Sequence, residues 1–581
     1  MKNNQILKRI ALVSVSALTL TFACKDQFLE VPPTASLAQA QLSSKDGVEG
    51  TLIGAYAQLA AKGFTRLAAG NNWVWGSIRG GENNKGTDAG DFTSINPMQR
   101  YEVQPTDGDL NSTWQAKYEG IARANAVINL ANGSTALSAA DKTRIIAEAR
   151  FLRGFFYFEL KRLWNSVPYV DEKVGYGQGI EKVANTPAIW DKIEADFKHA
   201  YDNLPETHSD AGRANKCAAL LGKVYVYQAK WADAKAILTT VINSGKTTNG
   251  KKYGLVPKFA EIFNAENDNN EEAIFAMQSS MNTGSTNNAN GFDDLNYPYN
   301  TGSDGPGNCC GFFQPTFSMA NAYRTVGGLP ILSEQGDGTP DYNLAANAVK
   351  NDYGKNTTDA FTEDTDPLDP RIDHTIGRRG IQYLDWIEHP GKNWIRDQTY
   401  AGPYSPKKYV YYKRQENTLT DGSSWTRGYA TMNFNIIRFA DVLLMAAEAE
   451  IEAGSLATAL GYINQVRARA ANPAGFVMKG GVAEANYVSS PYSAFADKAT
   501  AQKAVRMERM LELATEGHRF FDLVRWGTDV TTLNAYLGYE SKFLVTKFGG
   551  ASYQATDKYL PIPQAQIDIQ GTSILKQNPG Y

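Results

Sequence analysis

The chain has 581 residues, of which 43% are hydrophobic and 20% are charged, and its formal net charge is −3. This length and composition are ordinary for a folded protein with a core of several layers. A mildly acidic chain without a basic block excludes a typical nucleic-acid-binding protein and suits neutral or cationic ligands better than phosphates. Beyond the N-terminus, no apolar stretch approaches the ~18 residues that a membrane-spanning helix needs.

The N-terminus predicts export and lipid attachment. Met1–Ala23 joins a basic start to the apolar stretch Ile10–Phe22, the pattern of a signal peptide. Leu20–Cys24 resembles a lipobox, in which Cys24 becomes the lipidated first residue of the mature protein, and the alternative is an ordinary signal peptide followed by an unrelated cysteine. Because each buried CH₂ of an acyl chain contributes ~0.8 kcal/mol, a diacyl anchor would hold the protein at a membrane. Residues 24–40 are the predicted tether.

Helical periodicity predicts a mostly α fold. Region 41–250 contains two helical blocks, Trp114–Leu163 and Trp190–Ser244, and region 433–581 contains a third, Ile437–Ala471. In the second block, small and large side chains alternate as in tetratricopeptide repeats, where small residues let two antiparallel helices approach. These positions are Leu221, Gly222, Tyr225, Ala229, Ala234 and Leu238. The pattern predicts a tetratricopeptide-like scaffold of helical hairpins.

Region 251–432 differs from the flanking regions because it is irregular and rich in Gly, Asn, Asp, Pro and Tyr. Loops of this length are usually functional or disordered, and the many aromatic residues argue against disorder. Short strands are expected at Glu272–Met277 and Lys408–Tyr412, and the first helix of the third block is expected to end at Gly454. We predict a large loop-rich ligand-binding face with few short strands, built on the helical scaffold.

Several separated segments resemble the SusD/RagB family, whose members are partners of SusC-like TonB-dependent transporters in Gram-negative bacteria. They are Arg123–Ile128, Ala147–Phe158, Asn165–Val170, Arg438–Ala449, Ile463–Arg469, Glu508–Trp526, Pro561–Pro563 and Gln577–Tyr581. The departures from the family pattern are mild: Gly154 stands where Ala is common, and Asn165-Ser166 replaces Gly-Asp. The resemblance covers Cys24 to Tyr581 and implies a lipid-anchored protein on the outer membrane, facing outside, that captures a ligand over a transporter barrel.

The carboxylates near the C-terminal end are the strongest catalytic candidate. Spacing of four residues places helical side chains ~5–6 Å apart, near the carboxyl separation of retaining glycosidases. These acids are Glu508, Glu512, Glu516 and Asp522, and the interleaved bases are Arg506, Arg509, Arg519 and Arg525. Since acids on one helix face cannot flank a scissile bond, we expect structural ion pairs, no catalytic residues and no enzyme. The five histidines are scattered without CxxC or HExxH spacing, so no metal or other cofactor is expected.

Three aromatic and polar stretches predict carbohydrate binding, since sugars need a flat apolar platform beside groups that bond hydroxyls. The candidate glycan-binding residues are Trp73, Trp75, Asn83 and Lys85 in the first stretch, Tyr297, Cys309, Cys310 and Phe312 in the second, and Arg378, Tyr383, Trp394 and Tyr404 in the third. Alternatively, such rings pin long loops to the body and Arg378 forms a loop-fixing salt bridge. Cys309 and Cys310 are either a vicinal disulfide or two thiols.

The predicted function is cell-surface binding of an oligosaccharide and its delivery to a SusC-like transporter. Starch, fructan, xylan, pectin and host glycans all fit these features. The alternatives are the same fold binding peptides and, less favoured, a surface glycoside hydrolase.

Overall fold

The structure is a computed structural model that describes residues 39–216, 219–281, 294–307, 309–422, 427 and 429–581. The predicted signal peptide, the lipidation site Cys24 and nearly all of the predicted tether lie outside the described residues.

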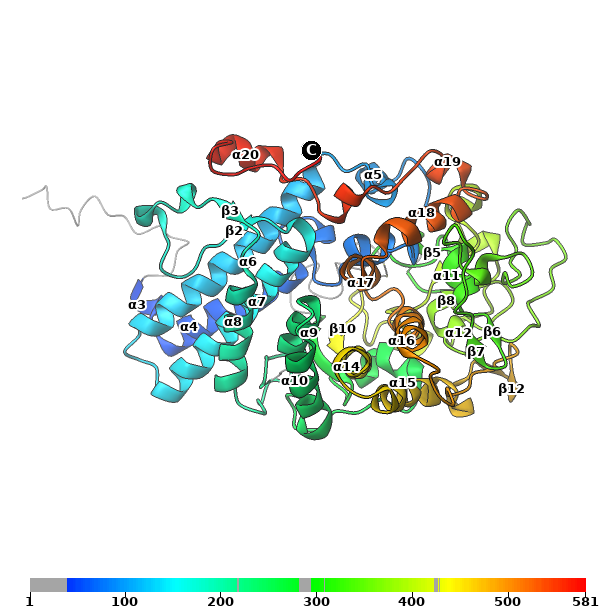
Figure 1. The fold of residues 1–581 in the computed structure, drawn as a ribbon, viewed down its shortest axis with the longest axis horizontal. Helices are drawn as coiled ribbons and strands as arrows, with labels where there is room; N and C mark the ends of the chain where they lie inside the picture. Colours follow the sequence, from blue (N-terminus) through cyan, green and yellow to red (C-terminus); the bar gives the residue numbers. More distant parts are fainter. Residues whose placement is uncertain (1–38, 217–218, 282–293, 308, 423–426, 428) are drawn as a thin grey trace, which may run out of the picture.

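Long helices form the N-terminal end of the molecule, drawn in blue and cyan in Figure 1. They are α4 (Lys45–Ala57), α6 (Gly108–Gly133), α7 (Ala139–Trp164) and α8 (Trp190–Asn203), and the single turn α3 (Gln39–Leu42) precedes them. Side-chain caps fix two of the N-termini: Ser44 accepts a hydrogen bond from the Gly47 N–H at α4, and Ser138 accepts one from the Asp141 N–H at α7. The first predicted helical block corresponds to α6 and α7, which pack on one another.

Helical hairpins continue the scaffold, as the periodicity predicts. They comprise α9 (Ala219–Tyr227), α10 (Trp231–Ser244), α14 (Phe439–Ala453), α15 (Leu456–Ala470) and α16 (Lys498–Glu512). A Cβ atom on Gly222 would lie 2.5 Å from Cδ2 of Leu238, so the small residue lets α9 and α10 approach. Helix α14 ends before Gly454, as predicted. The expectation of a mostly α scaffold is confirmed.

The remaining helices are short. They are α5 (Asn96–Arg100), α11 (Phe317–Ala322), α12 (Ile372–Thr375), α13 (Gln398–Ala401), α17 (Arg519–Trp526), α18 (Asp529–Glu540), α19 (Val545–Phe548) and α20 (Gln564–Gln570). A π-helical turn covers Trp73–Ile78, at the start of the first aromatic stretch.

The strands of the described residues form six antiparallel two-stranded sheets. They pair β1 (Asn83–Gly86) with β5 (Phe312–Pro315), β2 (Val167–Pro168) with β3 (Asn185–Thr186), β4 (Ala273–Met277) with β10 (Phe434–Arg438), β6 (Thr325–Val326) with β7 (Leu329–Pro330), β8 (Ile376–Gly377) with β9 (Ser405–Pro406), and β11 (Met478–Lys479) with β12 (Val482–Ala483). The strand expected at Glu272–Met277 is present. The strand expected at Lys408–Tyr412 is wrong, because Tyr409 has a left-handed backbone with φ of 57°, which interrupts an extended chain.

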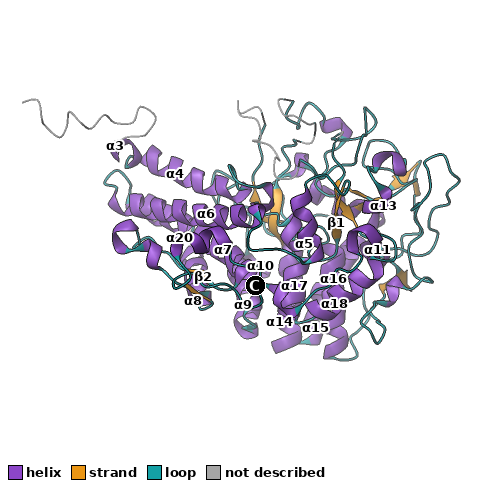
Figure 2. Cartoon of the chain, turned by 90° about the horizontal axis from the view of Figure 1, so that it is seen from above, coloured by secondary structure: helices purple, strands orange, loops and turns teal. Residues whose placement is uncertain are grey.

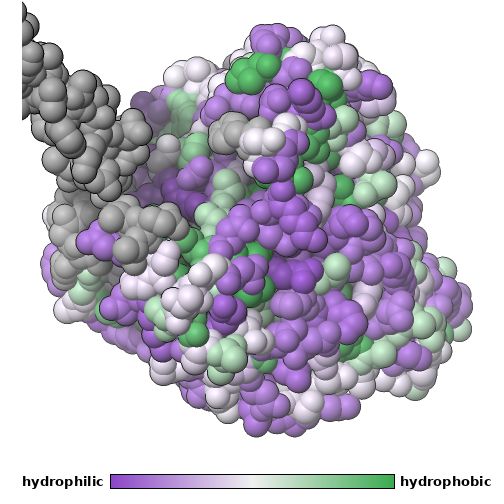
Figure 3. Space-filling model, turned by 90° about the vertical axis from the view of Figure 1, so that its left-hand side faces the viewer, coloured by the Kyte–Doolittle hydropathy of each residue, from purple (hydrophilic) through white to green (hydrophobic). Residues whose placement is uncertain are grey.

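One continuous hydrophobic core runs through the molecule and contains buried side chains from Val48 to Leu575. In Figure 2 the helices gather along the lower edge, and loops and short strands dominate the upper right. The loop-rich region packs onto the scaffold through the same core. The division of the chain into regions 41–250, 251–432 and 433–581 stays a prediction. The helical end seen in Figure 3 is mainly hydrophilic, with its apolar side chains in small groups. None of the described helices has the length and apolarity needed to cross a membrane.

Glu540, at the end of α18, gives a test of the packing between α18 and α11. Its Oε1 accepts a hydrogen bond from the Ser318 N–H at 2.8 Å, while Oε2 has no partner among the described residues. Burial raises the pKa of Glu540 to about 7. The unfolded chain therefore loses this proton at lower pH than the folded chain, so stability is lost as pH rises from about 4.5 to about 7.

We predict that Glu540→Gln removes this loss. The free energy of unfolding of the variant minus that of the unsubstituted protein should increase by about 2–3 kcal/mol from pH 5 to pH 8. Urea unfolding at both pH values measures it, with Glu181→Gln at an exposed position as the control. An equal pH dependence of Glu540→Gln and the unsubstituted protein would contradict the assignment.

Candidate ligand-binding site

A disulfide joins Cys309 to Cys310 in the loop that precedes β5, which decides between the two alternatives left by the sequence. Cys309 is half-buried and Cys310 is buried. The next residue, Gly311, has φ of 77°, and a Cβ atom there would lie 3.2 Å from the Tyr299 Cβ and 3.8 Å from the Arg396 Cβ. Glycine thus allows the disulfide loop to lie directly against Tyr299 and Arg396.

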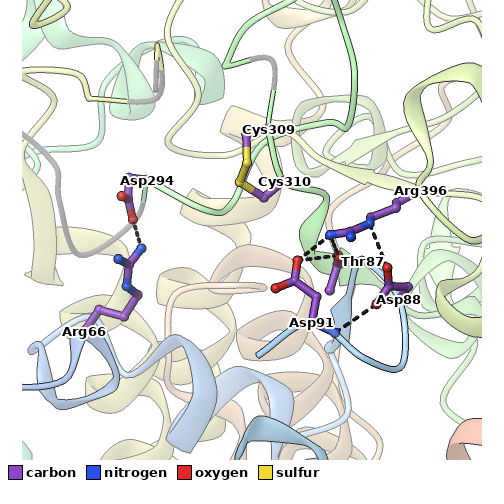
Figure 4. Close-up of a disulfide and its surroundings, with 8 residues drawn as sticks. All are labelled: Arg66, Thr87, Asp88, Asp91, Asp294, Cys309, Cys310 and Arg396. Carbon is purple, nitrogen blue, oxygen red and sulfur yellow. Dashed lines mark hydrogen bonds and ion pairs between the residues drawn. A yellow bond between two sulfur atoms is a disulfide. The ribbon is translucent and has the colours of Figure 1, made fainter. Parts of the chain in front are cut away.

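Arg396 organises one side of this loop, as Figure 4 shows. Its Nε lies 2.8 Å from Oδ2 of Asp88, and its Nη1 contacts Oδ2 of Asp91 and donates to Oγ1 of Thr87 at 3.0 Å. The guanidinium carbon also lies 5.5 Å from the centre of the half-buried Tyr299 ring. Two carboxylates and one ring therefore fix the position of a single cation at the surface.

A second ion pair lies on the other side of the disulfide in Figure 4, between the Arg66 guanidinium and the buried Asp294 carboxylate. We call the surface formed by Thr87, Asp88, Asp91, Tyr299, Cys309, Cys310 and Arg396 the disulfide rim. Its charged side chains remain about one-third exposed.

The disulfide rim presents the groups that carbohydrate binding needs. The partly exposed Tyr299 ring and the polarisable sulfurs supply apolar contact area. Oδ1 of Asp91 has no hydrogen-bond partner among the described residues, so it can accept a hydrogen bond from a hydroxyl group. The guanidinium of Arg396 is held in place and can donate to hydroxyl oxygens at its exposed edge.

The candidate residues of the first aromatic stretch are enclosed. The side chains of Trp75, Asn83 and Lys85 are fully buried and Trp73 is 2% exposed. The Trp75 indole N–H donates to the Leu67 carbonyl at 2.8 Å, and Asn83 Nδ2 donates to the Phe313 carbonyl at 2.7 Å. Lys85 Nζ donates to the Asp91 carbonyl at 2.7 Å, and burial lowers the pKa of Lys85 to about 8. These side chains position the loop that carries Asp88 and Asp91.

The candidates of the other two stretches are enclosed as well, except Cys309. Tyr297 and Phe312 are each 1% exposed, and the Phe312 ring packs edge-on against Phe92. The Tyr383 and Trp394 rings pack edge-on with centres 5.4 Å apart, and Tyr404 is buried beside Phe317. Buried rings offer no face to a ligand in this structure. The structure therefore brings the three stretches together through their buried side chains. Glycan contact at Cys309 and Cys310 stays a prediction.

Arg378 takes the alternative role that the sequence left open. Its Nε and Nη2 donate to the two Asp373 carboxylate oxygens at 2.6 and 2.8 Å, and its side chain is 4% exposed. Asp373 is also bonded by the Tyr487 hydroxyl at 2.6 Å. Arg378 thus fixes a loop through a buried bidentate salt bridge.

Sequence reasoning missed Tyr299, Arg396, Asp88 and Asp91 as site residues. Tyr299 lies two residues after Tyr297, within the stretch that the sequence indicated, and Arg396 lies two residues after Trp394. The composition of the stretches indicated this part of the chain, and among the selected residues only Cys309 is partly exposed in the structure.

The carboxylate cluster forms structural ion pairs, as expected, but its partners differ from those expected. Glu512 lies 2.6 Å from Arg438 and 3.0 Å from Arg371, and Arg469 is a third partner. Glu508 and Glu516 are paired in the same buried network. Of the interleaved arginines, Arg509 and Arg525 pair with Asp522. The other two, Arg506 and Arg519, instead lie over the Trp526 ring.

Comparison with known proteins places the fold. The SusD family profile matches residues 271–581, more than half of the chain. The chain belongs to the SusD family. A second family, described as starch-binding and associating with the outer membrane, matches residues 27–226.

Individual relatives agree with this membership. A SusD-like protein of Formosa agariphila is 25% identical over 586 aligned positions, which cover 96% of each chain. Among solved structures, a laminarin-binding SusD-like protein has a TM-score of 0.65 and 24% identity, and the match covers 93% of this chain and all of that one. The surface glycan-binding protein A of Bacteroides thetaiotaomicron, in complex with laminarihexaose, has a TM-score of 0.64 and 20% identity, with coverage of 92% and 99%. The likeness to these structures concerns the fold.

The buried network predicts a large structural effect of Glu512→Gln. This change leaves the Arg438, Arg371 and Arg469 guanidiniums without a full counter-charge, so we expect the free energy of unfolding to fall by about 3–5 kcal/mol. Urea unfolding at pH 7 measures the loss. The control is Glu102→Gln, because Glu102 is half-exposed in its pair with Arg100 and should contribute about 1 kcal/mol or less. Unchanged stability of Glu512→Gln would argue against the structural role.

Proposed function

We propose that this protein captures an oligosaccharide at the disulfide rim, outside the cell, and delivers it to a SusC-like TonB-dependent transporter without breaking a covalent bond. The observation that carries this proposal is the partly exposed Tyr299 ring, set beside the Arg396 guanidinium and the Asp88 and Asp91 carboxylates. A sugar ring lying on Tyr299 would place its hydroxyl groups toward these charges.

The relatives support a carbohydrate ligand. One solved structure of this fold is a laminarin-binding protein, and another was determined in complex with laminarihexaose. The second family match carries the description starch-binding. These ligands are made of neutral sugars, and neutral hydroxyl groups are what the disulfide rim suits.

Binding rather than catalysis also fits the buried carboxylates. Glu508, Glu512 and Glu516 are fully buried and each is paired with cations, so they cannot reach a glycosidic bond in this structure. The proposed attachment is a lipid at Cys24, which would hold the body at the outer membrane above the transporter. The description of the second family, associating with the outer membrane, supports this location.

The test is calorimetry with oligosaccharides from laminarin, starch, fructan, xylan and pectin, followed by substitutions measured with the tightest ligand. Tyr299→Ala removes the stacking surface and should weaken binding about tenfold, or about 1.4 kcal/mol. Tyr462→Ala, at a half-buried position on α15 in the helical scaffold, is the matched control and should leave the affinity unchanged.

Two outcomes would contradict the proposal. One is the absence of binding to every saccharide together with tight binding of peptides. The other is an oligosaccharide affinity that is the same for Tyr299→Ala and the unsubstituted protein.

A further inference from the structure

A groove on the helical scaffold is formed by elements that take no part in the disulfide rim. One part lies between α16, α17 and the segment 331–340. A second part lies between α9, α10, α14, α16 and the end of α17. Arg506 and Trp526 line both parts, so the two hollows adjoin at these side chains. Helices α14, α16 and α17 lie in the near half of Figure 1. We call this depression the basic groove.

The charges at the basic groove are unbalanced. The guanidinium carbons of Arg506 and Arg519 lie 5.1 and 5.8 Å from the centre of the Trp526 ring. Neither arginine has a carboxylate within ion-pair distance among the described residues, although Arg525, close by, is paired at 2.5 Å with Glu448. Lys503 adds a third cation, paired with the exposed Glu334 at 3.2 Å.

The two unpaired arginines are also partly shielded from water. Both side chains are half-buried, and burial lowers the pKa of Arg506. Glu448 and Glu452 attract Arg506 from beyond ion-pair distance, and a bound carboxylate in direct contact would offset more of the cost of holding this cation away from water. The fork of donors on each guanidinium matches a carboxylate in geometry.

The rest of the lining indicates the class of the ligand. Several side chains are apolar and adaptable: Ile331, Leu332, Met507, Met510 and Leu523. Methionine-rich surfaces adapt to varied apolar side chains, as in peptide-binding proteins. Arg506, Arg519 and Arg525 all lie over the Trp526 ring, so it offers no open platform for a sugar. These features favour a peptide over an acidic oligosaccharide.

We infer that the basic groove binds an extended peptide segment of a partner protein, in which a carboxylate side chain lies next to an apolar one. The carboxylate pairs with Arg506 and Arg519, and the apolar side chain packs on the partly exposed Ile331, Leu332 and Met507. The two adjoining parts of the groove suit a chain several residues long. This interaction is separate from oligosaccharide capture and does not depend on it.

The probe is a hexapeptide of alternating Glu and Leu, acetylated and amidated at its ends, titrated into the full chain by calorimetry. We expect it to bind, more weakly at 500 mM than at 50 mM NaCl because salt screens the charges. A hexapeptide of alternating Lys and Leu should not bind. The double variant R506Q/R519Q should bind the acidic peptide about tenfold more weakly, because two partly exposed ion pairs are lost.

The matched control is R123Q/R414Q, which removes two partly exposed arginines, each already paired with a glutamate elsewhere on the surface. It should bind the acidic peptide like the unsubstituted protein. R506K/R519K retains the charge and should recover part of the affinity, which keeps the test decisive if R506Q/R519Q fails to fold by circular dichroism. The inference is overturned if the acidic peptide does not bind the unsubstituted protein. It is also overturned if R506Q/R519Q and R123Q/R414Q bind this peptide with the same affinity, or if hexagalacturonate binds and the peptide does not.

Discussion

Complete pairing of buried charges around α16 is the constraint on which the structure depends. Five carboxylates, those of Glu272, Asp369, Glu508, Glu512 and Glu516, meet five cations, those of Arg371, Lys408, Arg438, Arg467 and Arg469. All are at most a few per cent exposed, so a missing partner would leave an uncompensated charge in the core. Because the partners come from the loop-rich region and from the scaffold, the two can be stable only when docked together.

The same constraint positions the disulfide rim. The turn that follows α16 is held to the first aromatic stretch by two buried hydrogen bonds: the Thr515 N–H donates to Glu82 and the Gly517 N–H donates to Ser77. A Cβ atom on Gly517 would lie 2.2 Å from the Asn71 carbonyl oxygen, so the two segments are in direct backbone contact. Glu82 immediately precedes β1, and β1 leads to Asp88 and Asp91. The loop that carries Asp88 and Asp91 is therefore fixed by a rigid connection to the charged core.

The sequence predicted the scaffold well because helices, and the close contacts between consecutive helices, depend on residues that are near one another in the chain. Periodicity located the hairpins, and the small Gly222 marked a close helix contact. The site was harder to predict because exposure is a tertiary property. Tyr297 and Tyr299 have the same chemistry and nearly the same neighbours in sequence, yet one is enclosed and the other lies at the surface. Likewise, the partners of Glu512 were unpredictable because Arg371 and Arg438 lie 141 and 74 residues away along the chain.

The pairing of surface arginines gives the two proposed binding surfaces different electrostatic character. At the disulfide rim, Arg396 faces two carboxylates, so an anionic ligand would meet local repulsion from Asp88 and Asp91 while neutral hydroxyl groups would not. At the basic groove, Arg506 and Arg519 are not paired with any carboxylate of the described residues. The carboxylates that line the groove, Glu334, Glu448 and Glu452, are each paired with another cation, so a net positive charge remains to attract an anion. In the proposed functions, a single side-chain type would thus favour neutral sugars at one surface and carboxylates at the other. The difference arises from whether the fold has already supplied the counter-charge.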